Sequence, residues 1–541
     1  MKKRLMLVVM CLCIGMSAVA FMGCGNSRGP REGELLIRAF EGGFGREWLY
    51  SALEEYREQN PEFRFHVEWD PNISSTITTR LVADSNLPDL FMTQPFNWRG
   101  QAIAGRLAPL DEVFESPAYY LEGYMYDEDG EPVYMYAYNA EGVLERTNNR
   151  QRDFVSVEDF VVDGFADSLI LRRLVDGELV PTNRYIVPWS VNSSSLAYNE
   201  RLLRMTATSR NIDGITQNGF WHNPPETTEQ LQWLVADINT TQAAGGYTGI
   251  GHNRRIYPFV FPGTAPNWLT FLHTNWWAQY QGLDMANTPS GEGSWYCFWN
   301  FYNLDVFRQS GLIRGYDMLR TLFTNSSGSW ANVSAQHGSM STSDAQRNFV
   351  MQNAVMMPVG SWLQREMSPV IGQAAQFIQA NDLRMMTLPT IEGARSERLN
   401  NADLGHFMGV PANALNVDLA RDFLKFLSTR DQMVEFTKYT GMMRPFNYDP
   451  LALAPNYEWT PFTRDIVRLF TENTNFFEMS TEHHPFFTHD GLDPYRPTIR
   501  DVISELPSRS GTQIVEEITI RWINDGGLWS QWHAAHGLTP R

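Results

Sequence analysis

Hydrophobic and polar positions over residues 35–93 switch between a period of two and a period near 3.6. The runs LLIRAF and PDLFMT predict strands, whereas REWLYSALEEYREQNP places Trp48, Leu49, Leu53 and Tyr56 at helical spacing. Strands that alternate with helices predict βαβ units around a mainly parallel sheet, so the expected fold class is α/β. The predicted elements are strand 35–40, helix 46–61, strand 63–69, helix 73–84 and strand 88–93.

Two later segments also carry helical signals. In residues 224–238, Thr227 or Thr228 can cap the start of a helix, and apolar residues follow at helical spacing. Residues 416–441 predict two successive helices, and Gly441 is a natural end for the second.

The N-terminus has the layout of a secretory signal. A cationic start is followed by an almost wholly apolar run to Met22 and by small residues just before Cys24. An uncleaved membrane anchor is the alternative, because the run reaches the roughly 18 residues at which a span becomes possible. The polar stretch after Cys24 favours the signal, so we expect residues 1–23 to be removed and residues 24–33 to form a tether.

The residues around Cys24 resemble the lipobox of bacterial lipoproteins, with Phe21 where leucine is usual. This resemblance implies that Cys24 carries lipid and that the protein is extracytoplasmic and anchored to the cell membrane. Two or more lipid chains hold a protein stably, since each buried methylene contributes about 0.8 kcal/mol.

Composition and charge narrow the function classes. The 541-residue chain has a formal net charge of −18, which disfavours nucleic acid and anionic membrane surfaces as partners. The same charge favours neutral or cationic ligands weakly, and solubility alone is a sufficient reason for it. Once the signal and Cys24 are set aside, Cys297 is the single remaining cysteine, so we expect no intrachain disulfide.

Several segments, taken in order, resemble the extracellular solute-binding proteins of bacterial ABC sugar importers. After the lipobox come a strand with a glycine-rich end (IRAFEGGFG), a helix that ends in Asn-Pro, and a Pro-Asp strand followed by GRLAPLD. YIVPWSVNSSSLAYNERLL resembles the hinge strand, and NAVMMPVGSWLQREM resembles a strand that ends in Gly-Ser-Trp. PPETTEQL, LPTIEGA and the segment ending in TGMMRP complete a likeness over most of residues 1–447. The tyrosine-rich stretch 116–184, interpreted as an inserted hairpin, and the tail after about 456 depart from it.

The resemblance implies a two-lobed fold of the periplasmic-binding-protein type II, in which each lobe is a sheet flanked by helices. It implies a carbohydrate ligand bound at the hinge, delivery to ABC permease subunits, no cofactor and no enzymatic activity; we also expect a monomer. By position, lobe one comprises 34–190 and 365–413, and lobe two comprises 196–360 and 417–541, with crossings near 188–195, 360–366 and 413–417.

A carbohydrate site needs aromatic rings for the C–H faces of the sugar and planar polar side chains for its hydroxyls. Aromatic residues make up 13% of the chain, but aromatic residues also fill cores, so position must decide. The resemblance places Trp362 against a sugar ring, with packing at the hinge as its alternative. Trp189 and Asn192 at the first crossing are further candidates, and the Asn192 amide can both donate and accept hydrogen bonds.

Loops after the first and third strands supply further candidates, because ligands of open α/β sheets bind beyond the carboxyl ends of strands. Loop packing is the alternative for each of them. His406 and Arg444 lie in segments that resemble cleft linings, with a structural histidine and a structural ion pair as their alternatives. The remaining candidates are Glu41, Phe44, Gln94, Phe96, Asn97 and Trp98.

Different function classes stay in view. A lipid-anchored hydrolase would need a catalytic site, but the sequence has no HExxH motif, GxSxG elbow or P-loop. The stretch TEHHPFFTHD (481–490) gathers acids and histidines without a strong metal-ligand spacing, and a polar loop is the simpler interpretation, so we predict no metal. The chain also fits a binder of a non-sugar solute, such as a peptide or polyamine, and a surface sensor or adhesin with this fold.

Overall fold

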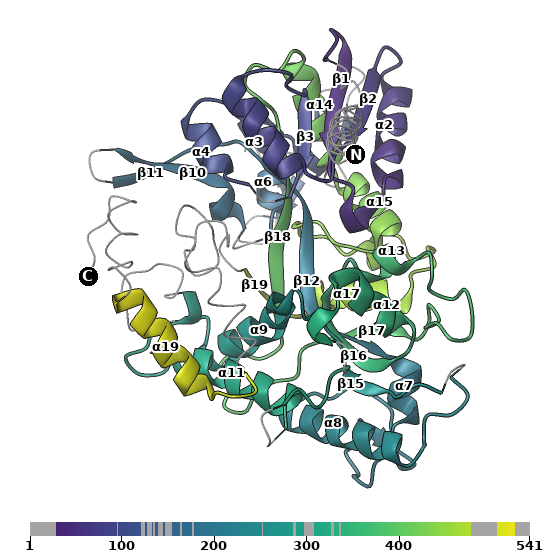
Figure 1. Ribbon diagram of the computed structural model, residues 1–541. Helices are drawn as coiled ribbons and strands as arrows, with labels where there is room; N and C mark the ends of the chain where they lie inside the picture. Colours follow the sequence, from purple (N-terminus) through teal and green to yellow (C-terminus); the bar gives the residue numbers. More distant parts are fainter. Residues whose placement is uncertain are drawn as a thin grey trace, which may run out of the picture.

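The computed structural model is a mixed α/β structure in which one large sheet runs through an upper and a lower lobe (Figure 1). The strand order is β15-β16-β12-β18-β3-β1-β2, with β17 paired to β12 and β19 paired to β18. These strands are β1 (Glu34–Ala39), β2 (Arg64–Trp69), β3 (Leu90–Thr93), β12 (Val187–Asn199), β15 (Tyr257–Phe259), β16 (Ala354–Gly360), β17 (Leu383–Met386), β18 (Leu399–Gly409) and β19 (Thr474–Phe477). The structure describes residues 29–94, 96–120, 125–126, 132–133, 136–138, 144–146, 154–162, 165–175, 178–250, 253–284, 288–296, 308–325, 329–334, 337–477 and 506–524.

The upper lobe, called lobe one, contains the parallel strands β3, β1 and β2. Every strand and helix predicted between residues 35 and 93 is confirmed to within a few residues. The sequence pattern explains this agreement, because the nearly continuous apolar run of β1 is buried along almost its whole length and the helix that follows it buries one face. The helices of this lobe are α2 (Glu47–Gln59), α3 (Ile73–Ala83), α4 (Trp98–Ile103), α5 (Asp111–Phe114), α6 (Val157–Phe160), α14 (Val417–Leu427) and α15 (Arg430–Thr440), with the 3-10 turns η1 (Gly42–Phe44) and η2 (Ala166–Leu169).

The lower lobe, called lobe two, is built around β15, β16 and β17 (Figure 1). The predicted helix at 224–238 is confirmed as α8, and Thr227 is its cap, forming a capping box with Gln230. Its helices are α7 (Glu200–Met205), α8 (Thr228–Ala243), α9 (Thr270–Gln281), α11 (Ser310–Phe323), α12 (Thr342–Val350), α13 (Leu363–Met367), α16 (Pro450–Leu453), α17 (Pro461–Glu472) and α19 (Gly511–Asn524), with the turns η3 (Pro266–Leu269) and η6 (His337–Ser339).

Short antiparallel pairs complete the structure. Four of them lie in the stretch that was predicted to be an inserted hairpin. The pairs are β4 (Pro117–Tyr120) with β9 (Phe154–Ser156), β5 (Met125–Tyr126) with β6 (Pro132–Val133), β7 (Tyr136–Tyr138) with β8 (Leu144–Arg146), β10 (Ile170–Val175) with β11 (Glu178–Arg184), and β13 (Thr216–Gln217) with β14 (Phe220–Trp221).

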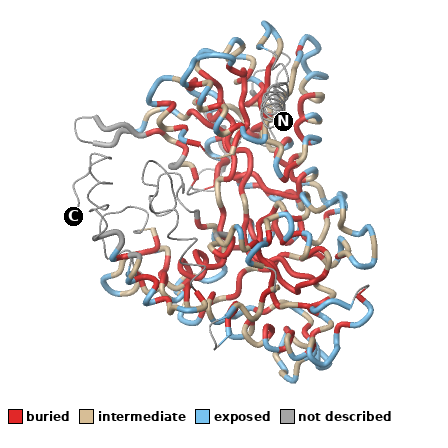
Figure 2. Tube along the Cα trace, viewed as in Figure 1, coloured by how far each residue is buried: buried red, intermediate tan, exposed pale blue. Residues whose placement is uncertain are grey.

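The long strands β12 and β18 belong to both lobes and connect their cores. At its start, β12 pairs Val187 with Met408 of β18, beside β3 of lobe one, whereas near its end Leu196 pairs with Pro358 of β16 in lobe two. On β18, Met408 pairs with Met92 of β3, whereas Leu399 at the other end pairs with Thr474 of β19. Figure 2 shows the buried chain running through the junction of the two lobes. Any movement of one lobe relative to the other must therefore bend or twist these two strands.

The division between lobes that was predicted from sequence differs from this packing in two segments. Residues 417–440 were placed in lobe two, but α14 and α15 pack against α2, with the rings of Tyr56 and Phe423 5.4 Å apart and Gln432 donating to Glu55. Residues 383–386 were placed in lobe one, but β17 pairs with the lobe-two end of β12. By this packing the chain crosses along β18 and again between α15 and α16, rather than at 360–366 and 413–417.

Asn416 fastens the segment before β1 to lobe one. Its side chain accepts from the Gly33 amide at 2.9 Å and donates to the Arg31 carbonyl at 2.9 Å. The carboxylate of Asp89 accepts from the backbone amides of both Asn416 and Leu36, at 2.9 and 2.8 Å. A buried carboxylate thus joins the start of the sheet to the N-terminal end of α14.

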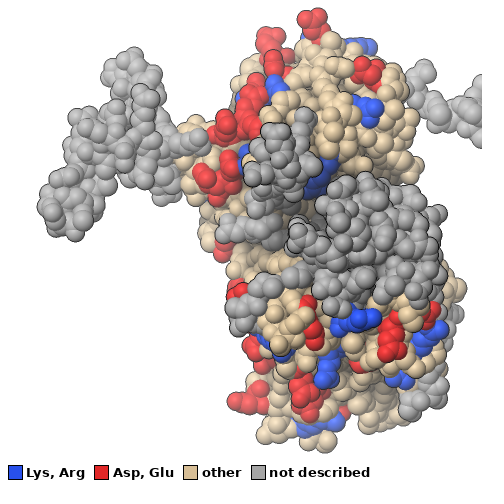
Figure 3. All heavy atoms as spheres, turned by 90° about the vertical axis from the view of Figure 1, so that its left-hand side faces the viewer, with Lys and Arg blue, Asp and Glu red and all other residues tan. Residues whose placement is uncertain are grey.

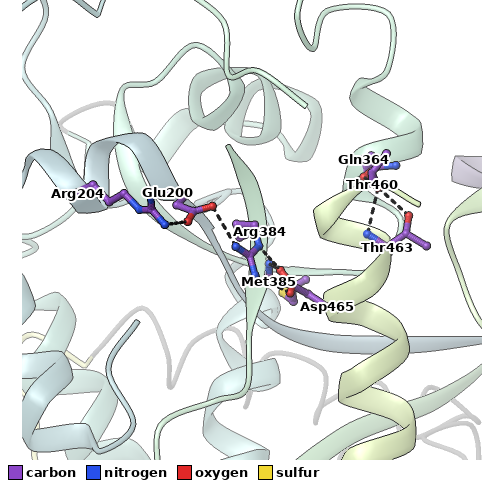
Figure 4. Close-up of polar contacts among 8 residues, drawn as sticks. All are labelled: Glu200, Arg204, Gln364, Arg384, Met385, Thr460, Thr463 and Asp465. Carbon is purple, nitrogen blue, oxygen red and sulfur yellow. Dashed lines mark hydrogen bonds and ion pairs between the residues drawn. The ribbon is translucent and has the colours of Figure 1, made fainter. Parts of the chain in front are cut away.

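A polar network braces α17 against β17 at the lobe-two side of the long strands (Figure 4). Arg384 donates to both carboxylate oxygens of Asp465, at 2.7 and 2.9 Å, and to Glu200 at 3.0 Å. Near the start of α17, the Thr460 hydroxyl donates to Gln364 on α13 at 2.7 Å. Because Glu200 lies on α7 and α13 follows β16, these contacts link four elements, α7, α13, α17 and β17, around the junction.

Several predictions fall outside the described residues: the signal peptide, the lipid site at Cys24, Cys297 and the stretch 481–490. Among the residues that are described, no helix is both long enough and apolar enough to span a membrane.

Candidate functional site

Strands from both lobes have their carboxyl ends beside one short stretch of β12 and β18. Thr93, the last residue of β3, lies opposite Phe407 of β18. Gly360, the last residue of β16, lies opposite Ser194 of β12. Since ligands of open α/β sheets bind beyond the carboxyl ends of strands, this junction is the candidate site.

Asn192 and Asp403 occupy opposed positions in the middle of this junction, on β12 and β18 respectively. Pairing is regular from Asn192 to Ser194, so the side chains of Asn192 and Asp403 lie on the same face of the sheet, and Ser194 lies on that face too. Gly360, opposite Ser194, shares that face too, and a β-carbon on Gly360 would overlap the Trp362 indole. The indole of Trp362 therefore lies on the same face as Asn192 and Asp403.

The indole of Trp362 is half-buried and packs edge-on against two aromatic rings of lobe two. Its ring lies 5.8 Å from that of Trp268 and 5.9 Å from that of Phe271, with interplanar angles of 77° and 74°. From lobe one, η1 approaches so closely that a β-carbon on Gly43 would lie 3.0 Å from Trp362 Cβ. Trp362 thus stands where the two lobes meet, with part of its surface exposed.

Among the described residues, the buried polar atoms at the junction that have no hydrogen-bond partner include Thr93 Oγ1, Asn192 Oδ1 and Ser361 Oγ. Each belongs to a strand end or to a long strand. Buried polar atoms are nearly always paired in native proteins, so unpaired ones need a reason. A polar ligand held between the lobes would supply the missing partners.

Asp403 is an acid in a mostly buried strand. The side chain is half-buried, and no hydrogen bond or ion pair reaches it from the residues that the structure describes. Burial raises the pKa of Asp403 from its usual 3.8 to about 6. A β-carbon on Gly405 would overlap the amide of Asn192, so the glycine leaves room for that amide beside Asp403.

Three of the predicted site residues form a buried aromatic cluster in lobe one. The ring of Phe44 lies 4.5 Å from that of Trp189 and 4.6 Å from that of His406. His406 Nδ1 is 2.8 Å from Ser190 Oγ, and burial lowers the pKa of His406 to about 3, so this imidazole is neutral at pH 7. The cluster packs the Phe44 ring, which belongs to the loop after β1, against residues of β12 and β18.

The loop after β3 is used mainly for packing. Phe96 and Trp98 are buried, and exposed Asn97 caps α4 by accepting from the Gly100 amide at 2.9 Å. Gln94 is half-buried directly beyond the end of β3.

Glu41 and Arg444 differ in their surroundings. Glu41 is partly exposed and pairs with Arg46 at 2.6 Å. Arg444 is buried and donates to the Leu427 carbonyl, and its Nε and Nη2 have no hydrogen-bond partner among the described residues. Burial lowers the pKa of Arg444 to about 10. The structural ion pair expected as the alternative role of Arg444 is not among the contacts of the described residues.

Of the predicted residues, the structure brings Trp362 and Asn192 to one face, with Glu41 and Gln94 at neighbouring strand ends. Sequence reasoning missed Asp403, Trp268 and Phe271. A signal for Asp403 was present, because a lone acid interrupts the strand pattern of LNNADLGHFMG. Trp268 and Phe271 carried no comparable signal among so many aromatic residues.

Over the face drawn in Figure 3, acidic side chains gather along one edge of the upper lobe, and both signs intermingle over the lower lobe. Within the described part of the chain, no group of three or more histidine, cysteine, aspartate or glutamate residues could hold a metal ion.

Solved structures share this fold. A chitin oligosaccharide binding protein aligns with a TM-score of 0.55 and 14% identity, over 93% of this chain and 99% of that one. A probable secreted solute-binding lipoprotein from Streptomyces coelicolor aligns at 0.57 and 13%, over 90% and 98%. A structure solved for xylan utilization by Caldanaerobius polysaccharolyticus aligns at 0.56 and 13%, over 91% and 100%. No family model and no curated protein matches the sequence.

The fold is therefore that of the two-lobed solute-binding proteins, as the sequence predicted. At these identities the likeness defines the architecture, and the ligand must be argued from the junction of the lobes.

Proposed function

We propose that this protein is a lipid-anchored, extracytoplasmic solute-binding protein that captures an oligosaccharide between its lobes and delivers it to the permease of an ABC transporter. The observation that carries the proposal is the placement of a half-exposed indole, Trp362, on the same face as the amide of Asn192 and the carboxyl of Asp403. An aromatic plane beside planar hydrogen-bonding groups suits a sugar ring.

Two further observations support a carbohydrate ligand. The structural neighbours include a chitin oligosaccharide binding protein and a structure solved for xylan utilization. The unpaired polar atoms at the junction also favour a ligand rich in hydroxyl groups over an apolar one. Lipid attachment at Cys24 and delivery to a permease rest on the N-terminal sequence and on the fold.

The proposed mechanism is hinge closure along β12 and β18. A ligand that contacts both lobes binds the closed arrangement more tightly than the open one, so it shifts the population toward closure. The permease then recognises the closed form. None of these steps needs a catalytic group.

The test is a thermal-shift screen of residues 26–541 against mono- and oligosaccharides, with peptides, polyamines and divalent metals as controls. A ligand at 100 times its Kd should stabilise the protein by about 2.7 kcal/mol. Trp362→Ala should then weaken binding of the active glycan by a few kcal/mol. Trp330→Ala is the matched control, because Trp330 is also half-buried but packs on Phe261 and His337. Stabilisation by no glycan, or equal effects of both variants, would refute the proposal.

A further inference from the structure

The polar groups between the lobes are unbalanced, and this imbalance points to a class of glycan. Asn192 Oδ1 is buried and accepts no hydrogen bond, and Asp403 beside it has neither a donor nor a counter-charge among the described residues. Both groups are acceptors in this arrangement. The missing partner must therefore be a donor, and the carboxylate favours a donor with positive charge.

We propose that the carbohydrate ligand carries an ammonium group, as an unacetylated amino sugar does, and that Asp403 is the residue that selects it. The inference rests on the proposed function, since it concerns the ligand of the same site. The carboxylate of Asp403 pairs with the ammonium group, and Asn192 Oδ1 accepts one of its remaining hydrogens.

The strand register brings the two acceptor groups to the face of the sheet that carries the Trp362 indole. The Asn401–Ser194 pair lies two residues from Asn192 along β12. It is covered by α9, because Asn401 donates to Thr274 on that helix at 3.1 Å. Asn192 and Asp403 lie just beyond this cover and on the face of Trp362. A sugar ring stacked on the indole can therefore direct a substituent toward the carboxyl group.

A neutral hydroxyl group is the alternative donor to Asp403, and it differs from an ammonium group in charge. A hydrogen bond between an ionised carboxylate and an ammonium group is roughly twice as strong as one between neutral groups. An amide at position 403 would keep the shape of the side chain and an acceptor oxygen but would lose the charge. Asp403→Asn should thus remove the preference for the amine and spare the binding of neutral rings.

The experiment compares three trisaccharides that differ at C2: cellotriose, N-acetylated chitotriose and fully deacetylated chitotriose. Calorimetric titrations at pH 7 use the wild type, Asp403→Asn and Asp418→Asn, the last being a charge control whose side chain is 95% exposed. We expect the deacetylated trimer to bind the wild type at least tenfold more tightly than cellotriose. Asp403→Asn should reduce that ratio to near one, and Asp418→Asn should leave it unchanged.

Each result has a distinct meaning. Equal affinity of the wild type for the three trimers, or a loss in Asp403→Asn that is the same for all three, overturns the amine preference but leaves the carbohydrate function standing. Binding of spermidine in place of every glycan overturns the proposed function and this inference together. If Asp403→Asn still binds the deacetylated trimer more tightly than cellotriose, Asp403 does not select the amine.

Discussion

The guanidinium of Arg384 holds both carboxylate oxygens of Asp465, and so joins β17 to α17 (Figure 4). Asp465 is nearly buried, and its side chain is 8% exposed. Burial raises the pKa of this carboxyl even though Arg384 opposes the shift. The ion pair therefore acts mainly to make a buried carboxylate tolerable.

Breaking this pair should destabilise the fold. We expect Arg384→Met to lower the free energy of unfolding by about 3–5 kcal/mol, because it leaves a buried charge without a partner. Urea unfolding followed by circular dichroism measures the change. Arg398→Met is the matched control, since the Arg398–Glu472 pair is 4.0 Å long and exposed, and such pairs contribute about 0–1 kcal/mol. Similar losses in the two variants would contradict the role given to Arg384.

The half-buried carboxyl of Asp403 should make stability depend on pH. Its pKa in the folded protein, about 6, lies above its usual 3.8, so the folded state holds the proton more tightly than the unfolded state. This contribution to stability is full below pH 3.8 and is lost as the pH rises to about 6. Asp403→Asn should therefore be more stable than the wild type at pH 7, by about 1–3 kcal/mol, with the gain vanishing near pH 4. Unfolding at both pH values measures it, and a gain that is equal at the two would refute the assignment.

Gly360 should be needed for the position of Trp362. A β-carbon at this residue would overlap the indole, so Gly360→Ala must displace the ring from its place beside Trp268 and Phe271. We expect roughly tenfold weaker glycan binding, along with about 1–3 kcal/mol of destabilisation from overpacking. Calorimetry gives the affinity. Gly338→Ala serves as the control, because nothing lies within 4 Å of a β-carbon there. Unchanged affinity in Gly360→Ala would show that the ring position is unimportant.

The capping box of α8 offers a test away from the site. Thr227 accepts from the Gln230 amide at 3.2 Å, while the Gln230 side chain accepts from the Thr227 amide at 3.3 Å. Thr227→Ala should cost about 1 kcal/mol of stability without changing ligand affinity. In the control Thr321→Ala, the exposed hydroxyl that is lost bonds only within its own helix, so the change should stay within about 0.5 kcal/mol. If Thr227→Ala lost no more stability than Thr321→Ala, the cap would contribute little.

The strands and helices of lobe one were predictable because each buries a face that its own sequence pattern specifies. The pattern does not specify which strands pair across long distances, and that pairing makes the site. Asn192 and Asp403 become neighbours only through the register of β12 and β18. The same reason explains the misplaced segments, since the packing of α14 and α15 on α2 depends on contacts between residues far apart in the sequence.

Many sequence-derived candidates became packing residues for a related reason. Phe44, Trp189 and His406 sit close to strand ends in the chain, but their rings face one another inside lobe one. A loop near a site needs its own small core to hold its shape, and aromatic residues build that core. Sequence position alone does not separate the rings that support a loop from those that face a ligand.

The bonds around Asn416 and Asp89 also have a mechanical consequence. They tie the backbone at Arg31 and Gly33 to the edge where α14 begins, so any tension along the chain ahead of β1 is passed to lobe one. In the proposed closing motion, lobe one is therefore the stationary frame, and lobe two is the arm that swings. Tension along the tether would act on lobe one alone, so the angle between the lobes would depend on ligand binding and not on the tether.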